Sequence, residues 1–362
     1  ITGELDAATL DVSGASDLAG TVTISGAGSN LLVGGTSFDN GNFSGSANGI
    51  NVFDATHPIM LLKETGNDNT FEMGLTSSAA FVATQDAIPM KFATSDTVVF
   101  EIAADGAPST PTAGTSNVRF GVNAGNSIAS GGNYNVVVGD EAGTALTTGD
   151  ENTALGYEAL DALNTASRNV AIGKGALSAD TKGDQSVAVG ANTLQSQNFT
   201  TSTNTFNTAV GYFAGQQVTT ATGATLIGGL AGDSITTGAD NTAVGYNALI
   251  TNETSANNTA VGVSALKLNT GADNTAVGRG ALLNQAAGTG NVAVGKDAGN
   301  DITSGVKNVL VGTLTGDALT DADRNVAIGD QALGTDTLGS RSTAIGFGAL
   351  NVQNFTTAVL KV

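Results

Sequence analysis

The sequence of 362 residues contains no cysteine, no tryptophan and one histidine, His57. The lack of cysteine excludes disulfides and thiolate metal sites, and a single histidine excludes a zinc site built from several imidazoles. A Ser/His/Asp or Cys/His catalytic site would depend on His57 alone, so we expect none. No apolar run approaches the length that a membrane-spanning helix needs, which excludes such a helix.

Charged and aromatic side chains are also scarce, at 12% and 5% of the residues. The 13 basic and 32 acidic residues give a net charge of −19, which argues against binding to nucleic acid. Together with 50 glycines, this composition is unlike that of a common enzyme and typical of an extracellular β-protein. Because the sequence begins at Ile1 and shows no signal peptide, we expect a fragment, a processed chain or the ordered part of a longer chain.

What the sequence has in abundance is a short repeat, of which Asn241-Thr242-Ala243-Val244-Gly245 is one copy. Its glycine occurs fourteen times, at a spacing that is nearly constant along the chain. A fixed short period predicts a solenoid in which each unit is one coil. The repeat glycines should lie at corners that need a positive φ or the absence of a side chain. They are Gly121, Gly139, Gly156, Gly173, Gly190, Gly211, Gly228, Gly245, Gly262, Gly278, Gly295, Gly312, Gly329 and Gly346.

The residues before each glycine predict a short strand. A β-branched residue, a small residue (alanine in ten units) and a second branched residue alternate, which places the branched pair on one face and alanine on the other. Neither face is polar, so both should be covered. We expect one face to fill the coil interior and the alanine face to receive a second sheet or chain. The asparagine that usually opens the strand, such as Asn152, should form a turn-capping ladder between coils about 4.8 Å apart.

The second half of each coil supplies one apolar plug. Four residues after the glycine stands leucine in eight units, such as Leu249, and glycine in six. In all six glycine units an apolar residue follows three positions later, such as Ile235, so each coil should bury one plug contributing about 1.5–3 kcal/mol. The two classes run Gly-Gly-Leu-Leu-Leu along the chain, and the repeat alone gives no reason for this five-coil order.

Four segments are expected along the chain. Residues 1–50 read as a strand-poor, intertwined shaft segment, and residues 51–105 as a small β-sandwich-like module with strands at 59–62, 70–75, 80–83, 90–93 and 97–102. Residues 106–115 contain two prolines and read as a linker. Residues 116–362 form the β-solenoid of 17-residue repeats.

One unit, between Gly190 and Gly211, is longer than all the others. It contains Gln197-Asn198-Phe199-Thr200-Thr201, which recurs as Gln353-Asn354-Phe355-Thr356-Thr357, so the chain should reach an equivalent insertion at its end. A loop that protrudes from regular coils is the best candidate for contact with a partner. We therefore expect the residues from Phe199 to Phe206 to form such a contact.

Two copies of the strand motif carry a family resemblance. Asn169-Val170-Ala171-Ile172-Gly173 and Asn325-Val326-Ala327-Ile328-Gly329 resemble the head repeats of trimeric autotransporter adhesins. The 17-residue period and Gly245-Tyr246-Asn247-Ala248-Leu249 are more similar to repeat arrays of phage tail fibres, and residues 55–106 resemble the β-rich module that precedes them. The resemblance implies a parallel β-roll in which three chains pack side by side. Together with the repeat it predicts an all-β, left-handed parallel solenoid of about 14 coils, about 67 Å long, assembled as a homotrimer.

The function favoured is structural: part of a phage tail fibre, on the virion, that mediates attachment to the host surface. Its expected partners are two further copies of the chain, other fibre or tail proteins, and a host surface glycan or protein. No enzymatic activity, cofactor, metal or membrane insertion is expected. A bacterial trimeric surface adhesin or extracellular filament is the alternative. A polysaccharide-cleaving tailspike is least favoured, because the acids fall on turns and few aromatics could grip a sugar.

Two further sets of residues invite a ligand role. Acids such as Asp240 and Asp273 could bind calcium at the turn before the strand. Arg168 and Lys307 occupy the same position in other units, which argues against a calcium ladder. Glu151 should instead form an ion pair with Arg168. Aromatic residues after the repeat glycine could stack on sugars or, as we favour, cover a corner or a chain interface. These are Tyr157, Tyr212, Tyr246 and Phe347.

Overall fold

The computed structural model describes residues 59–63, 70–75, 80–84, 90–94, 97–102, 108–109, 114–355, 357 and 359–360. Its regular elements are all strands, and these residues contain no helix. The predicted shaft segment 1–50 and His57 lie outside the described residues. The chain divides into two compact units, Ile1–Ile88 and Pro89–Val362, which are described separately.

The first unit contains a three-stranded antiparallel sheet of β1 (Ile59–Lys63), β2 (Thr70–Leu75) and β3 (Ala80–Thr84). In the second unit, β4 (Met90–Thr94), β5 (Thr97–Ile102) and β6 (Pro108–Ser109) form another antiparallel sheet. The five strands expected between residues 59 and 102 are therefore present, although they belong to two units. The segment expected to be a linker, 106–115, contains β6.

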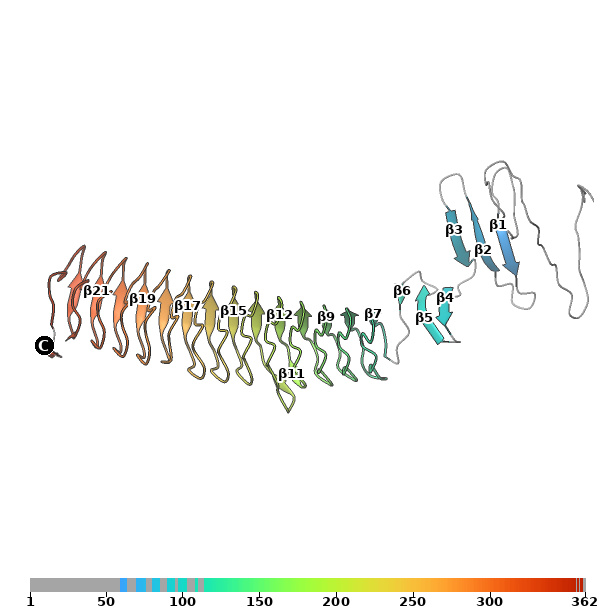
Figure 1. Cartoon of the computed structure of the whole chain (residues 1–362), viewed down its shortest axis with the longest axis horizontal. Coiled ribbons are helices and arrows are strands. Elements are labelled where there is room, and N and C mark those ends of the chain that lie inside the picture. Colours follow the sequence, from blue (N-terminus) through green and yellow to red (C-terminus); the bar gives the residue numbers. More distant parts are fainter. Residues whose placement is uncertain are drawn as a thin grey trace, which may run out of the picture. The chain divides into compact units, whose positions relative to one another are not determined.

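The second unit continues as a parallel β-solenoid, in which fourteen three-residue strands form one sheet and are joined by thirteen turns (Figure 1). The register repeats from coil to coil, with Thr242 beside Thr259 and Thr259 beside Thr275. The predicted parallel solenoid and its 17-residue repeat are confirmed. The strands are β7 (Val118–Phe120), β8 (Val136–Val138), β9 (Thr153–Leu155), β10 (Val170–Ile172), β12 (Val187–Val189), β14 (Thr208–Val210), β15 (Thr225–Ile227), β16 (Thr242–Val244), β17 (Thr259–Val261), β18 (Thr275–Val277), β19 (Val292–Val294), β20 (Val309–Val311), β21 (Val326–Ile328) and β23 (Thr343–Ile345).

The alanine at the centre of ten of the fourteen strands faces the coil interior. Ala243 is 0% exposed, whereas Thr242 and Val244 on either side of it are half-buried. The expectation that the branched pair fills the interior is therefore wrong. A coil of this short period has a narrow cross-section that also holds the strand-opening residue and the apolar plug, so in most coils the strand centre is a small side chain.

The exchange of plugs between the two coil classes is confirmed. Leu249 and Ile235 are both fully buried, although they occupy different positions in their coils. The same holds for the other plugs except Leu350 in the last coil, which is 43% exposed because no described coil covers it.

The five-coil order has a packing explanation. Coils of the glycine class come in pairs, and the second strand of each pair carries a large central residue in place of alanine: Val137, Leu226 or Leu310. A side chain added at Gly215 or Gly232 would lie 2.6 or 2.7 Å from the methyl groups of Leu226. The two glycines therefore leave the space that one large strand residue fills.

Shortening a plug should destabilise the solenoid in either class. We expect Leu249→Ala and Ile235→Ala each to lower the free energy of unfolding by about 2–5 kcal/mol, because each leaves a cavity in the coil interior. Leu350→Ala is the matched control and should cost little. Urea unfolding curves of the three variants measure the effect, and a loss at Leu350 equal to that at Leu249 would contradict the burial argument.

The repeat glycines are required for two reasons. Gly245 has a φ of 136°, and a Cβ atom built on it would lie 2.6 Å from the carbonyl oxygen of Gly262 in the next coil. Both parts of the expectation, positive φ and close approach, are therefore met at this corner.

A pair of alanine substitutions separates these two effects. At Gly346 the φ is 123° but nothing lies within 4 Å of an added Cβ, so Gly346→Ala should cost only the backbone strain, about 1–3 kcal/mol. Gly245→Ala should cost clearly more, because two coils must also separate. Thermal melting of both variants gives the comparison, and equal losses would show that close approach contributes nothing.

Candidate functional surface

The outward side of the fourteen-stranded sheet is a regular surface that continues through all the coils. Because side chains alternate along a strand, the residues on either side of the central position face outward in two columns. We call these two columns the outer sheet face. The first column consists of seven threonines and seven valines, and the second of fourteen apolar residues. The second column is Phe120, Val138, Leu155, Ile172, Val189, Val210, Ile227, Val244, Val261, Val277, Val294, Val311, Ile328 and Ile345.

The outer sheet face carries almost no charge. The only charged residue in the fourteen strands is Arg119, and it occupies a central position rather than either outward column. This absence of charge contrasts with the net charge of −19 of the whole chain. Several of the apolar side chains of the face are strongly exposed, such as Ile227 at 40%, Leu155 at 45% and Ile345 at 67%. A continuous exposed apolar strip of this kind marks an interaction surface.

Two columns, composed mostly of polar, charged and aromatic residues, border the outer sheet face. The leading rim is the residue just before the position that opens each strand, and all fourteen of its members have a positive φ, between 52° and 69°. The trailing rim is the residue just after each repeat glycine. The leading rim is Ser116, Tyr134, Glu151, Arg168, Gln185, Phe206, Gly223, Asp240, Asn257, Asp273, Gly290, Lys307, Arg324 and Arg341. The trailing rim is Val122, Asp140, Tyr157, Lys174, Ala191, Tyr212, Gly229, Tyr246, Val263, Arg279, Lys296, Thr313, Asp330 and Phe347.

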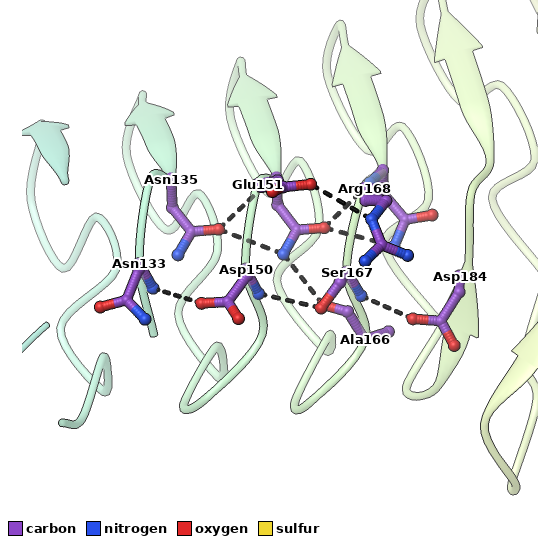
Figure 2. A network of polar contacts seen from close by, with 10 residues as sticks. Asn133, Asn135, Asp150, Glu151, Ala166, Ser167, Arg168 and Asp184 are labelled. Atoms are coloured by element: carbon purple, nitrogen blue, oxygen red, sulfur yellow. Dashed lines mark hydrogen bonds and ion pairs between the residues drawn. The ribbon is translucent and has the colours of Figure 1, made fainter. Parts of the chain in front are cut away.

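A ladder of buried asparagines holds the start of most strands (Figure 2). The backbone N–H of Asn152 donates to the side-chain oxygen of Asn135 at 2.9 Å, and the Asn152 amide donates to the carbonyl oxygen of Ala166 at 2.9 Å. Each asparagine thus caps the next coil and fixes its own turn, as the sequence predicts. The leading rim is therefore attached to a rigid backbone.

The ladder changes where serine replaces asparagine. At Ser186, Gln197 reaches in from the long unit and donates to Ser186 Oγ at 2.8 Å and to the buried Asp180 Oδ2 at 2.5 Å. Gln353 donates in the same way to Asp336 at 2.7 Å. The inserted segment therefore has a structural role, because its glutamine fills the space left by the shorter side chain.

The long unit forms an extra pair of strands, β11 (Gly183–Asp184) and β13 (Thr203–Asn204), and extends beyond the other coils near β11 (Figure 1). The predicted equivalent at the end of the chain is confirmed, because β22 (Gly339–Ser340) pairs with β24 (Val359–Leu360) in the same way. Phe199 is buried at 7% exposure, whereas Phe206 is 62% exposed and lies on the leading rim. The partner contact expected from Phe199 to Phe206 would therefore involve Phe206 and the exposed residues 200–202, but not the side chain of Phe199.

The part of the chain that the structure describes contains no group of three or more His, Cys, Asp or Glu side chains that could hold a metal ion. It also contains no helix with the length and apolar character needed to cross a bilayer. Glu151 and Arg168 form the ion pair expected from their positions, at 3.2 Å. Both side chains are more than half exposed, so the pair contributes less than about 1 kcal/mol.

The trailing-rim aromatics are exposed. Tyr157, Tyr212 and Tyr246 are 43%, 58% and 55% exposed, and Phe347 is 82% exposed. The ring of Tyr212 stacks on that of Phe213, with 4.0 Å between centroids. Both interpretations, sugar stacking and packing at a corner or chain interface, remain predictions.

Three half-buried carboxyl groups lie on the side turns of the solenoid, and burial raises the pKa values of Asp161, Asp233 and Asp317. Asp233 Oδ1 is buried and has no hydrogen-bond partner in the described solenoid. At pH values above the raised pKa, Asp233 is ionised in both states. Only the folded state is destabilised, because only there is the carboxylate partly removed from water. Below the ordinary pKa of 3.8, both states are protonated and this cost disappears.

Asp233→Asn should therefore raise the midpoint of thermal unfolding at pH 7. The gain should shrink as the pH falls through the raised pKa toward about pH 3. Melting curves of the two proteins across this range test the sign. A gain that is the same at pH 7 and pH 3 would show that ionisation of Asp233 is not its cause.

No protein-family profile, curated protein or solved structure matches the chain. The sequence identified the columns that form the outer sheet face but placed them inside the coil, so it missed the apolar face that lies outside.

Proposed function

We propose that the chain is a non-catalytic structural segment of a phage tail fibre, assembled as a homotrimer through the outer sheet face. The uncharged outer sheet face, which extends over all fourteen strands, is the observation that carries this proposal. Association of copies would remove its branched side chains from water, and the rims would remain as the polar border usual at protein interfaces.

A parallel arrangement of three copies suits the dimensions of this face. Each face is only two side chains wide, because each strand has three residues and its central residue points inward. Three such faces around a common axis would contribute six side chains per level, enough to fill a narrow triangular core without a central channel. Identical coils at identical heights would continue this core along the whole solenoid.

In this assembly the fibre carries −57, three times the −19 of one chain. We place it on the virion, joined to other fibre or tail proteins and directed toward a host surface glycan or protein. The motif at Asn169 and Asn325 supports the second candidate, a bacterial trimeric surface adhesin. The two candidates differ in where the chain is found, on phage particles or on bacterial cells.

The oligomeric state of the purified chain tests the assembly. Light scattering should give three times the chain mass of 35.6 kDa. A stable monomer would overturn the proposal. Immunogold labelling of phage particles and of bacterial cells from the source culture tests the location, and label confined to cells would favour the adhesin.

A further inference from the structure

We infer that neighbouring copies pack with the leading rim of one along the trailing rim of the next, in parallel and coil against coil. This inference rests on the proposed assembly through the outer sheet face, because the two rims border that face. The partner of each rim is therefore a second copy of this chain.

The first observation is a change of sign along the leading rim. At the levels of β16 to β19 its charged residues are Asp240 and Asp273, and from β20 onward they are Lys307, Arg324 and Arg341. All five are exposed. Three bases in adjacent coils, about 4.8 Å apart, repel one another unless opposite charge lies close by.

The trailing rim changes sign at the same height and in the opposite sense. Its charged residues at the levels of β16 to β19 are Arg279 and Lys296, and from β20 onward the charged residue is Asp330. The two rims are thus oppositely charged on both sides of the boundary between β19 and β20. This match would arise if the rims face each other at equal heights.

The rims cannot pair within one chain. Residues of one level, such as Arg324 and Asp330, lie on opposite sides of an extended strand, here β21, and six residues of chain can separate their Cα atoms by up to about 20 Å. Lys307, Arg324, Arg341 and Asp330 form no ion pair within residues 114–355. The acid nearest in sequence to this cluster, Asp323, instead accepts the Val306 N–H at 2.9 Å. Their opposite charges therefore remain available to another copy.

Level-by-level contacts between rims are chemically suitable. Asp273 would face Arg279, and Arg324 would face Asp330. At the end of the sheet, Arg341 would lie against the ring of Phe347, which is 82% exposed, in a cation–π contact.

At some other levels the charges of the two rims are less complementary. Arg279 and Lys296 already lie 2.8 and 3.7 Å from Asp297 in their own chain, so Asp273 would share Arg279 with Asp297. The one like-charged level is Arg168 with Lys174, where Arg168 is neutralised by Glu151 and Lys174 lies 5.7 Å from the ring centre of Tyr157.

Contact between like rims is unfavourable by the same reasoning. If parallel copies met leading rim to leading rim, Lys307, Arg324 and Arg341 would face their own counterparts. The charges therefore select a contact between unlike rims, which closes into a ring when the copies are related by rotation about one axis.

Disulfide trapping tests the contact directly, because the chain has no cysteine of its own. The variant Phe206→Cys/Tyr212→Cys places two thiols at one level on opposite rims, both at exposed positions. Within one chain the extended strand β14 lies between the two positions, which should hold them farther apart than the Cα separation of about 7 Å that a disulfide allows. Oxidation should therefore link neighbouring copies, giving covalent dimers and closed trimers on a non-reducing gel. Arg341→Cys/Phe347→Cys should give the same products at the other end of the sheet.

The controls distinguish the possible arrangements. Phe206→Cys or Tyr212→Cys alone should give no covalent dimer, and Phe206→Cys/Phe347→Cys, whose levels differ, should give none either. Dimers from a single variant would show that like rims meet and would overturn the inference. Absence of cross-links in variants that keep the mass of a trimer would also overturn it, while leaving the proposed fibre intact. A monomeric parent protein would remove the proposed function itself.

Discussion

Replacing Ala243 with glutamate should unfold the coils around it, even in a single copy of the chain. Ala243 is 0% exposed, and it lies in register between Leu226 and Ala260, which are also fully buried. A glutamate there is too large for the interior and would bury an unpaired charge, which costs several kcal/mol. Circular dichroism melting and limited proteolysis should detect the loss.

Ala243→Ser is the matched control, since it adds one small polar atom at the same place. It should melt closer to the parent protein than to Ala243→Glu. If Ala243→Glu melts at the temperature of the parent protein, the strand centre does not face a closed interior.

A charge introduced on the outer sheet face should have the opposite effect to Ala243→Glu: the solenoid should stay folded, but the copies should no longer assemble. Ile227→Glu places a carboxylate at a position that is 40% exposed in one chain, so a single solenoid tolerates it. In a core formed by three faces, three carboxylates would converge without partners, and the cost would exceed what association gains. Light scattering should show a fall from about three chain masses to one.

Leu268 supplies the matched control, because it is 42% exposed but lies outside the outer sheet face. Leu268→Glu should keep the mass of the parent protein. A trimer that persists in Ile227→Glu would mean that copies associate through another surface.

The period, the strands and the plugs could be predicted because they depend on local spacing. The sequence did not allow us to predict that the branched pair points outward. Alanine and valine are both apolar, so neither indicates which side of the strand faces solvent. One signal was nevertheless present. The strand centre carries a large apolar residue, as at Leu226 and Leu310, only within pairs of glycine-class coils. A side chain whose size depends on glycines elsewhere in the coil must share the interior with them.

The outer sheet face shows the same limit of sequence reasoning. Its columns are visible in the repeat, and so are the charges on both rims, including Asp273 and Arg324. The two rims border a single exposed face only once the coil is closed and the direction of each side chain is known. The role of Gln197 was hidden for a similar reason, because its partner Asp180 belongs to the preceding unit.

The direction of the hydrogen bonds determines how the solenoid would respond to pulling. Bonds such as that from Thr242 N–H to the Asn258 carbonyl, at 2.8 Å, join one coil to the next and so lie along the row of coils. Tension along the row loads the junctions in series, and the weakest opens first. Between β15 and β16 the asparagine ladder is interrupted, because Ala224 has no side-chain oxygen to offer Asn241. A solenoid under tension along the row of coils should open first at this junction, and single-molecule extension should then record stepwise lengthening rather than one rupture.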